Sequence, residues 1–253
     1  MKERIKGAIL IYSCHKHKDT RLKEFRLTND EYDGWKVFYI LGNPSIEKDY
    51  MTNDNTILLK CEDSYIHVAK KVVLGIKFVF DKYEIEEGIL RCGDDLIFDE
   101  NNLVEFLKMQ NKQDYMGVVA NQETTNIVSE TNFFMPSYYY SHQEELSNPL
   151  NCIKLSINEL MSLNQVPKLK YAGGVIVYLS KKSCDVLVSH FESIEWNVFQ
   201  SHPIYGYPYI IEDISVGYIL YINNIHVQAY PFYVDNPSLK NNTTIAIHTN
   251  KYK

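Results

Sequence analysis

Two adjacent aspartates, Asp94 and Asp95, stand between two short apolar runs of the chain, 88–90 and 96–98. Neighbouring carboxylates repel each other, so such a pair at the end of a buried strand is favoured when a cation offsets its charge. Carboxylate oxygens bind Mg²⁺ or Mn²⁺ together with phosphate oxygens. The pair therefore indicates a divalent-metal site beside a nucleotide diphosphate. The alternative is a solvated turn that caps the following helix.

A second acidic pair, Glu212 and Asp213, stands where a segment of helical character begins and runs to Tyr221. A carboxylate within hydrogen-bond reach of a hydroxyl can take its proton as a general base. Acids are also favoured at a helix N-terminus by the backbone dipole, whatever their chemistry. Both interpretations can hold for the same residue, because a fixed helix start is a good place for a base.

Two glycines, Gly173 and Gly174, precede the apolar run 175–179. Without side chains the backbone there can approach a ligand closely, although a plain tight turn explains the pair equally well. Aromatic residues gather in two places, 133–140 and 205–209, and could stack on sugar rings. The second cluster is the stronger candidate, because it adjoins Glu212.

The elements that must position these residues alternate along the chain. Near-continuous apolar runs are typical of strands covered on both faces, and spacings of three and four are typical of helices. The pattern predicts strands at 8–12, 37–41, 56–59, 88–91, 115–119 and 174–179, and helices at 64–82, 101–109, 180–190 and 212–221. Residues 122–166 have weaker periodicity and predict a loop-rich insertion or a lid. We expect an α/β layer architecture with ligands at the carboxyl ends of the strands.

The composition of the chain limits its possible partners, the state of its cysteines, its location and its number of domains. The 253 residues carry a net charge of -6, which argues against nucleic acid as a partner. Five scattered cysteines without a C-x-x-C pair indicate reduced thiols. No apolar run approaches the roughly 20 residues that cross a bilayer, and the N-terminus lacks signal-peptide features, so we expect a cytoplasmic protein. Without an internal repeat or long linker, one domain is favoured.

Four blocks of this sequence resemble the glycosyltransferase family 31 enzymes, the fringe and β-1,3-galactosyltransferase-like group. The blocks are similar to the family patterns D-S-Y-x-N-L-T-x-K, L-K-x-D-D-D-x-F, Y-x-x-G-G-G-Y-V-L-S and E-D-V-x-V-G. They stand in the family's order at residues 63–71 (D-S-Y-I-H-V-A-K-K), 90–98 (L-R-C-G-D-D-L-I-F), 171–180 (Y-A-G-G-V-I-V-Y-L-S) and 212–217 (E-D-I-S-V-G). Each block is weak alone, and their joint order is specific. The resemblance covers about residues 56 to 250.

The resemblance implies a GT-A fold, with one Rossmann-like domain over 1–253 and a mostly parallel central sheet flanked by helices. Residues 1–120 would form the nucleotide-sugar-binding half, and 121–253 the acceptor-binding and catalytic half. It implies an inverting transferase that uses Mn²⁺ (or Mg²⁺) and a UDP-sugar donor, with a glycan acceptor and a β-1,3 linkage. The absence of a membrane anchor would fit a bacterial or large-virus enzyme.

The resemblance also assigns roles to individual residues. Asp95 matches the family's metal-chelating aspartate, with Asp94 at the ribose or a metal-bound water. Asp213 matches the family's base, with Glu212 as support. Donor contacts would come from Ser13, Thr20, Arg21, Asp63, Lys71, Gly173 and Gly174, and His248 would complete the metal shell. The alternatives for Arg21 and Lys71 are solvated charges.

Several points stay open at the level of sequence. Gly93 replaces the first aspartate of the family motif, which puts donor recognition in doubt more than metal binding. His226 competes with His248 but falls in a predicted strand, and His15 and His17 fit a solvated basic loop better than a metal site. The other candidate functions are a metal-dependent nucleotidyl or phosphoryl transferase and a glycan-binding protein without activity.

Overall fold

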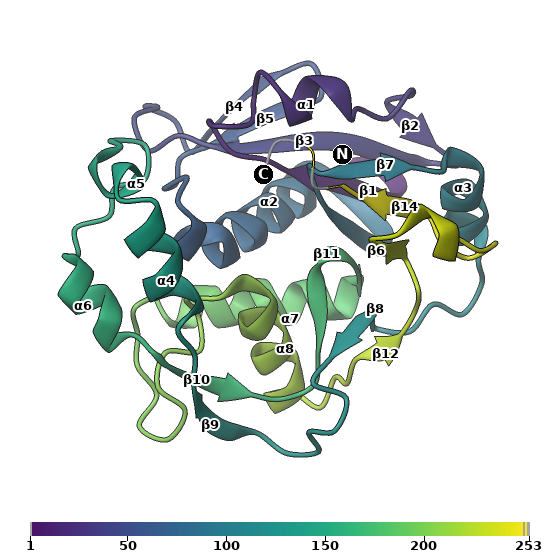
Figure 1. Ribbon diagram of the computed structural model, residues 1–253. Coiled ribbons are helices and arrows are strands. Elements are labelled where there is room, and N and C mark those ends of the chain that lie inside the picture. Colours follow the sequence, from purple (N-terminus) through teal and green to yellow (C-terminus); the bar gives the residue numbers. More distant parts are fainter. Residues whose placement is uncertain (1, 250, 252–253) are drawn as a thin grey trace.

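The structure is a computed structural model that describes residues 2–249 and 251. Over these residues its main feature is a nine-stranded sheet in the order β12-β8-β11-β6-β1-β3-β5-β4, with β2 paired to β3 (Figure 1). The strands are β1 (Glu3–Tyr12), β2 (Glu31–Tyr32), β3 (Trp35–Gly42), β4 (Tyr50–Asn53), β5 (Thr56–Leu59), β6 (Tyr83–Gly93), β8 (Tyr115–Ala120), β11 (Tyr171–Ser180) and β12 (Gln228–Ala229). The six strands predicted from apolar runs are therefore present, whereas the strand predicted around His226 is wrong, because residues 225–227 precede β12 and form no strand.

This sheet is mixed. Strand β1 is parallel to β3 and β6, β3 is parallel to β5, and β12 is parallel to β8. Strand β11 runs antiparallel to both β6 and β8, and β2 and β4 also pair in the antiparallel sense. The expected mostly parallel sheet is therefore not confirmed. An apolar run has the same composition in either direction, so the run 174–179 did not reveal the direction of β11.

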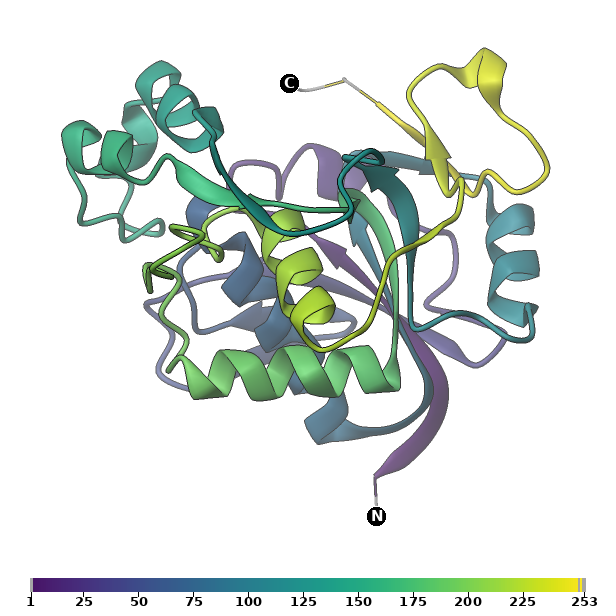
Figure 2. The same ribbon diagram turned by 90° about the horizontal axis from the view of Figure 1, so that it is seen from below.

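Helices cover both faces of the sheet (Figure 2). Side chains alternate along β1, so that Leu10 faces one hydrophobic cluster while Ile9 and Ile11 face the other. The first cluster is covered by α2 (Val68–Lys82), α7 (Lys181–Ser193) and α8 (Glu212–Ile222), and the second by α3 (Glu100–Lys108). Figure 2 shows α3 on the opposite side of the sheet from the other three. Buried apolar stripes thus hold these four predicted helices in place.

The helix starts follow local capping chemistry only in part. Serine, aspartate and asparagine at a helix start are typical caps, so the sequence predicts Ser180 as a cap of one helix and Asp63 and Ser64 as caps of another. Ser180 accepts a hydrogen bond from the Ser183 N–H at the start of α7, and Asp99 caps α3 in the same way. Asp63 and Ser64 do not act as side-chain caps. A 3₁₀ turn, η1 (Tyr65–His67), precedes α2 there, and its start has no side-chain cap. Since Asp99 caps α3, the alternative of Asp94 and Asp95 as caps is also excluded.

Residues 122–166 contain more regular structure than the sequence predicted. They form a strand pair, β9 with β10, and three short helices near the start of α2 (Figure 1). The elements are β9 (Val128–Thr131), α4 (Phe134–Ser141), α5 (Glu144–Ser147), α6 (Ile157–Ser162) and β10 (Gln165–Lys168). Short helices show little periodicity, but Ser156 and Glu159 form a capping box at α6 that is visible in the sequence.

A small sheet brings the last part of the chain beside β6. It contains β13 (Tyr233–Val234), β14 (Ala246–His248) and β7 (Leu96–Phe98), in the order β13-β14-β7. The remaining short helices are α1 (Arg21–Glu24) and η2 (Pro237–Leu239). Because β7 follows the turn after β6, this sheet places His248 next to Asp95. Among the described helices none has the length and hydropathy needed to span a bilayer.

Candidate active site

Asp94 and Asp95 form the turn between β6 and β7, at the carboxyl end of a central strand. Tyr12 pairs in register with Gly93, so Ser13, the next residue after β1, lies beside Asp94. The Ser13 hydroxyl donates to Asp94 Oδ2 at 2.5 Å. The predicted Ser13 and Asp94 are therefore brought together at the edge where ligands of α/β sheets gather.

Two basic side chains, Arg21 and His248, face this turn. Arg21 Nη1 donates to Asp94 Oδ1 at 3.3 Å and to Asp95 Oδ2 at 3.4 Å. His248 Nε2 lies 3.3 Å from Asp95 Oδ2, and its Nδ1 lies 2.7 Å from Asp235 Oδ1. Burial alone would raise the pKa of Asp95, but the hydrogen bond to His248 and the charges of His248 and Arg21 outweigh it and lower that pKa. Asp95 is thus held as a carboxylate.

Gly93 leaves room for the Asp95 side chain. A Cβ on residue 93 would lie 2.9 Å from Asp95 Oδ1, closer than side chains normally approach. An aspartate at this position would displace the Asp95 carboxylate. The space that a side chain at residue 93 would enter is therefore occupied by the carboxylate of Asp95.

Asp63 and Lys71, both predicted donor contacts, are paired with each other beneath the loop after β1. Lys71 Nζ donates to Asp63 Oδ1 at 2.8 Å and to the Ser13 carbonyl at 2.7 Å. Asp63 Oδ2 accepts the backbone N–H of His15 at 2.6 Å. Burial alone would lower the pKa of Lys71, but the charge of Asp63 raises it. The pair fixes the loop that presents Ser13 to Asp94, and within that loop the Thr20 hydroxyl donates to the His17 carbonyl.

Replacing Lys71 with methionine is expected to lower the free energy of unfolding by about 3 kcal/mol, because Asp63 would stay buried without its counter-charge. Urea unfolding followed by circular dichroism measures the change. Lys70→Met is the matched control: Lys70 pairs with Glu62 through side chains that remain 20% and 25% exposed. Its loss should stay below about 1 kcal/mol. Equal losses in the two variants would contradict the structural role of Lys71.

Glu212 and Asp213 form the first turn of α8 and lie against β11. Glu212 Oε2 accepts a hydrogen bond from Arg91 Nη2 at 3.1 Å, and both side chains are about nine-tenths buried. A Cβ on Gly174 would lie 2.5 Å from Glu212 Oε2, so only glycine leaves room for this carboxylate. Asp213 Oδ1 accepts the Ile214 N–H at 2.9 Å. A side chain at position 173 would meet less resistance, because a Cβ added to Gly173 would lie 3.5 Å from the Tyr233 hydroxyl oxygen, an ordinary contact distance.

The electrostatics of this acidic pair suit proton transfer. Burial raises the pKa of Glu212 to about 7, although Arg91 opposes the shift and Asp213 adds to it. Burial also raises the pKa of Asp213, against the hydrogen bond from Ile214, the charge of Arg91 and the backbone N–H of Gly174. A carboxyl group with a raised pKa is a better proton acceptor near neutral pH.

Arg91 was not singled out as a site residue from the sequence, and the structure makes it the link between the two acidic pairs. It belongs to β6, three residues before Asp94, and its side chain reaches Glu212 on α8. The available signal was its position: a cation between the apolar Leu90 and Cys92 needs a buried partner.

The other histidines and the second aromatic cluster lie elsewhere. Residues 225–227 precede β12, and His226 packs edge-on against Tyr221 with ring centroids 5.2 Å apart. His15 Nδ1 contacts the buried Asp63 at 3.0 Å. In the cluster 205–209, Tyr209 is only 6% exposed and its hydroxyl is hydrogen-bonded to His190. The last tyrosine of that cluster, Tyr209, is therefore buried in the hydrophobic core.

A metal at this site would find few protein ligands. Within residues 2–249 and 251, no group of three or more His, Cys, Asp or Glu side chains is arranged to hold a metal ion. Asp95 and His248 converge from two segments and could supply one oxygen and one nitrogen, with Asp94 beside them. This donor set fits a Mg²⁺- or Mn²⁺-type ion that is held by one or two carboxylates and takes its other ligands from phosphate and water.

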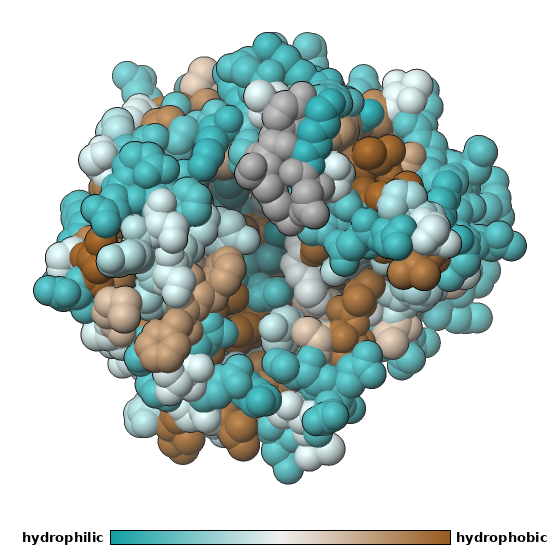
Figure 3. Space-filling model, viewed as in Figure 1, coloured by the Kyte–Doolittle hydropathy of each residue, from teal (hydrophilic) through white to brown (hydrophobic). Residues whose placement is uncertain are grey.

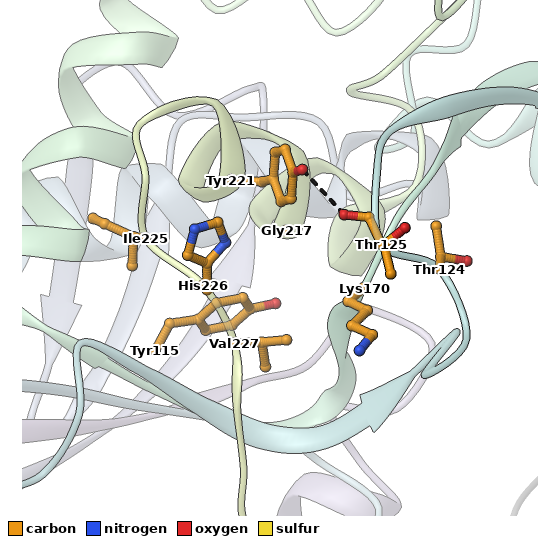
Figure 4. A pocket seen from close by; sticks show the side chains of 9 residues that line it. All are labelled: Tyr115, Thr124, Thr125, Lys170, Gly217, Tyr221, Ile225, His226 and Val227. Carbon is orange, nitrogen blue, oxygen red and sulfur yellow. Dashed lines mark hydrogen bonds between the residues drawn. The ribbon is translucent and has the colours of Figure 1, made fainter.

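A pocket at the other end of α8 has a different character (Figure 4). It is lined by Tyr115, Thr124, Thr125, Lys170, Gly217, Tyr221, Ile225, His226 and Val227. The Tyr221 hydroxyl donates to the Thr125 carbonyl at 3.3 Å across it. None of these lining residues is a carboxylate, so this pocket lacks the acids needed for the chemistry above. Figure 3 shows a separate hollow near the centre of the face seen in Figure 1, bordered on the α4 side by side chains of intermediate to hydrophobic character.

Most of the chain matches the sequence model of a known protein family. The sequence model of a family described as Galactosyltransferase matches residues 28–230, which include Asp63, Asp94 and Asp213. A search of curated proteins found no match.

Proposed function

The chain belongs to the galactosyltransferase family, and from its two acidic pairs we propose that it moves a sugar from a UDP-sugar donor to a glycan hydroxyl with inversion, forming a β-1,3 linkage. The match to this family supports a glycosyltransferase activity and confirms the resemblance seen in the sequence. It implies a sugar donor and a glycan acceptor. The donor, the metal dependence and the linkage belong to the proposal.

One observation carries the proposal: the Arg91–Glu212 contact of 3.1 Å joins the strand that leads to Asp94 and Asp95 to the helix that begins with Glu212 and Asp213. One acidic pair suits a diphosphate with its cation, and the other suits a proton acceptor. A transferase needs both functions on the two sides of the bond that it breaks. A nucleotidyl or phosphoryl transferase could also use the second pair as a base, so the family match decides between the two functions.

We assign the donor side to Ser13, Arg21, Asp94, Asp95 and His248. A Mn²⁺ or Mg²⁺ ion bound here would act as a Lewis acid that neutralises the diphosphate leaving group. Arg21 adds a guanidinium that can pair with phosphate oxygens. The buried Asp63–Lys71 pair holds the loop between these residues in place. Most of the proposed donor contacts thus come from the first 120 residues.

We assign the proton transfer to Asp213. Its carboxylate takes the proton of the acceptor hydroxyl while that oxygen forms a bond to the anomeric carbon. The bond between the anomeric carbon and the phosphate oxygen breaks, and its electron pair leaves with UDP. Because the hydroxyl attacks opposite the leaving group, the configuration inverts. Arg91 and Glu212 hold the first turn of α8 against β11 and tune the charge beside Asp213.

Incubation with a panel of UDP-sugars and Mn²⁺ tests the proposal. We expect slow release of UDP from at least one donor and faster release when a glycan acceptor is added. Release of pyrophosphate or a nucleoside monophosphate would favour the nucleotidyl or phosphoryl transferase. Glycan binding without any binding of UDP would leave a non-catalytic glycan-binding protein and overturn the proposal.

The pH dependence follows from the acidic pair. Protonation of Glu212, whose pKa is raised to about 7, removes the partner of Arg91, and protonated Asp213 cannot accept a proton. We expect kcat/KM to rise about tenfold per pH unit below neutrality and to level off above a midpoint near 7. In Glu212→Gln that midpoint should disappear. A pH profile of the variant identical to that of the wild type would exclude Glu212 as its origin.

A further inference from the structure

Three aromatic rings stand together where α4 meets η1, the turn that precedes α2. The ring centroids of Tyr65 and Phe134 are 5.5 Å apart at an interplanar angle of 57°, and those of Tyr65 and Tyr138 are 4.9 Å apart. Tyr65 is 47% exposed and Phe134 is 46% exposed. The tilted rings of Tyr65 and Phe134 form two walls with Tyr138 beside them. We call these three residues the aromatic wedge.

The wedge is fixed in place by the residues behind it. On α4, Met135 and Tyr139 are buried, and the Tyr139 hydroxyl accepts the N–H of Ile66 at 3.3 Å. This contact ties α4 to η1, the turn that carries Tyr65. Tyr138 is half-buried, and the ring of His142 stacks on it at 4.5 Å. Preordered aromatic rings of this kind bind a ligand with little loss of side-chain entropy.

The wedge also lies near the proposed base. Tyr65 belongs to the turn that leads into α2, and α2 packs against α8, whose first turn carries Asp213. The pKa of Tyr65 is raised, first because neighbouring protein reduces the solvation of its hydroxyl and then by the negative charges of Asp213 and Glu212. In Figure 3 the hydrophobic side chains on the α4 side border the hollow at the centre of this face.

We propose that the aromatic wedge binds one sugar ring of the acceptor glycan and so presents a neighbouring hydroxyl to Asp213. The C–H faces of a pyranose pack on aromatic rings, and tyrosine hydroxyls supply hydrogen bonds to sugar hydroxyls. The nearby carboxylates of Glu212 and Asp213 make a lipid tail a poor occupant. The inference rests on the proposed function and adds an acceptor subsite to it. Specificity for the acceptor would then reside in Tyr65 and in the segment 122–166, which belongs to the acceptor-binding half.

Saturation-transfer NMR with lactose, cellobiose and chitobiose, in the presence of UDP and Mn²⁺, tests the subsite on the full chain. We expect at least one disaccharide to bind the wild type and Phe134→Ala to weaken that binding by about tenfold. Tyr140→Ala is the matched control: Tyr140 is on the same helix and 68% exposed, and it is not part of the wedge. Phe134→Tyr should bind like the wild type.

The outcomes separate the subsite from the transferase itself. Equal binding by Phe134→Ala and the wild type, or no binding of any of the three disaccharides by the wild type, overturns the subsite. Calorimetric titration with UDP and Mn²⁺ reports on the donor side independently. Binding of UDP without the disaccharide leaves the transferase standing and removes the wedge. Wedge-dependent binding of the disaccharide by a chain that binds no UDP supports the subsite and overturns the transferase.

Discussion

Asp213→Asn should lower the rate constant of sugar transfer by about 10² to 10⁴ while leaving the binding of UDP unchanged. The side-chain oxygen of asparagine can still accept the Ile214 N–H, which lies 2.9 Å from Asp213 Oδ1 in the native protein. The shape of the first turn of α8 is therefore kept. What the variant loses is the negative charge and the basicity needed to take the acceptor proton. The loss should appear in kcat, with a small change in the KM for the donor.

A control variant and a binding measurement make the interpretation specific. Asp185→Asn changes an exposed acid of α7 in the same chemical way and should transfer sugar at the wild-type rate. Calorimetry with UDP and Mn²⁺ should give the same affinity for all three proteins. Transfer by Asp213→Asn at the wild-type rate would remove Asp213 as the base. A parallel loss of UDP binding would show that its role is structural.

The layers of the fold were predictable because they depend on local patterns. The run 8–12 becomes part of β1, and the stripe over 64–82 becomes η1 and α2, since burial of an apolar face decides both. Strand direction depends on connections that the pattern does not encode, so antiparallel β11 beside β6 was missed. The short helices of 134–162 are held by single anchors, such as Tyr139 on Ile66, and such anchors leave no period in the sequence.

The candidate site was likewise predictable from the sequence only in part. The structure places His248 beside Asp95 and Arg21 beside both Asp94 and Asp95, while the roles that the resemblance gives these residues stay predictions. The sequence could not reveal which charged residues are buried against each other. Lys71 matches a family lysine, yet the structure buries it against Asp63, where it acts on the site through Ser13. Whether a charge faces a ligand or a neighbour is decided by tertiary packing, which residue spacing does not encode.

The departure at Gly93 has a consequence for the donor side. The Asp95 carboxylate folds over Gly93, where it is held between Arg21 and His248. A cation bound at Asp95 Oδ2 would compete with the contact of this atom with Arg21. Arg21 would keep its contact with Asp94 and could also pair with phosphate oxygens of the donor. The single carboxylate at position 95 thus becomes the residue on which metal and donor binding depend most.

Asp95→Asn is therefore expected to weaken the binding of UDP in the presence of Mn²⁺ by at least about 100-fold, because the variant loses the charged ligand. His248→Ala should lose less, and Asp235→Asn less again, since Asp235 acts only through a 2.7 Å contact to His248. Electron paramagnetic resonance of bound Mn²⁺ and calorimetry measure this order without any need for turnover. The thermal stabilisation that Mn²⁺ and UDP give the wild type should vanish in Asp95→Asn. Undiminished Mn²⁺ binding by that variant would exclude Asp95 as a metal ligand, and the diphosphate would then depend on Arg21 for its counter-charge.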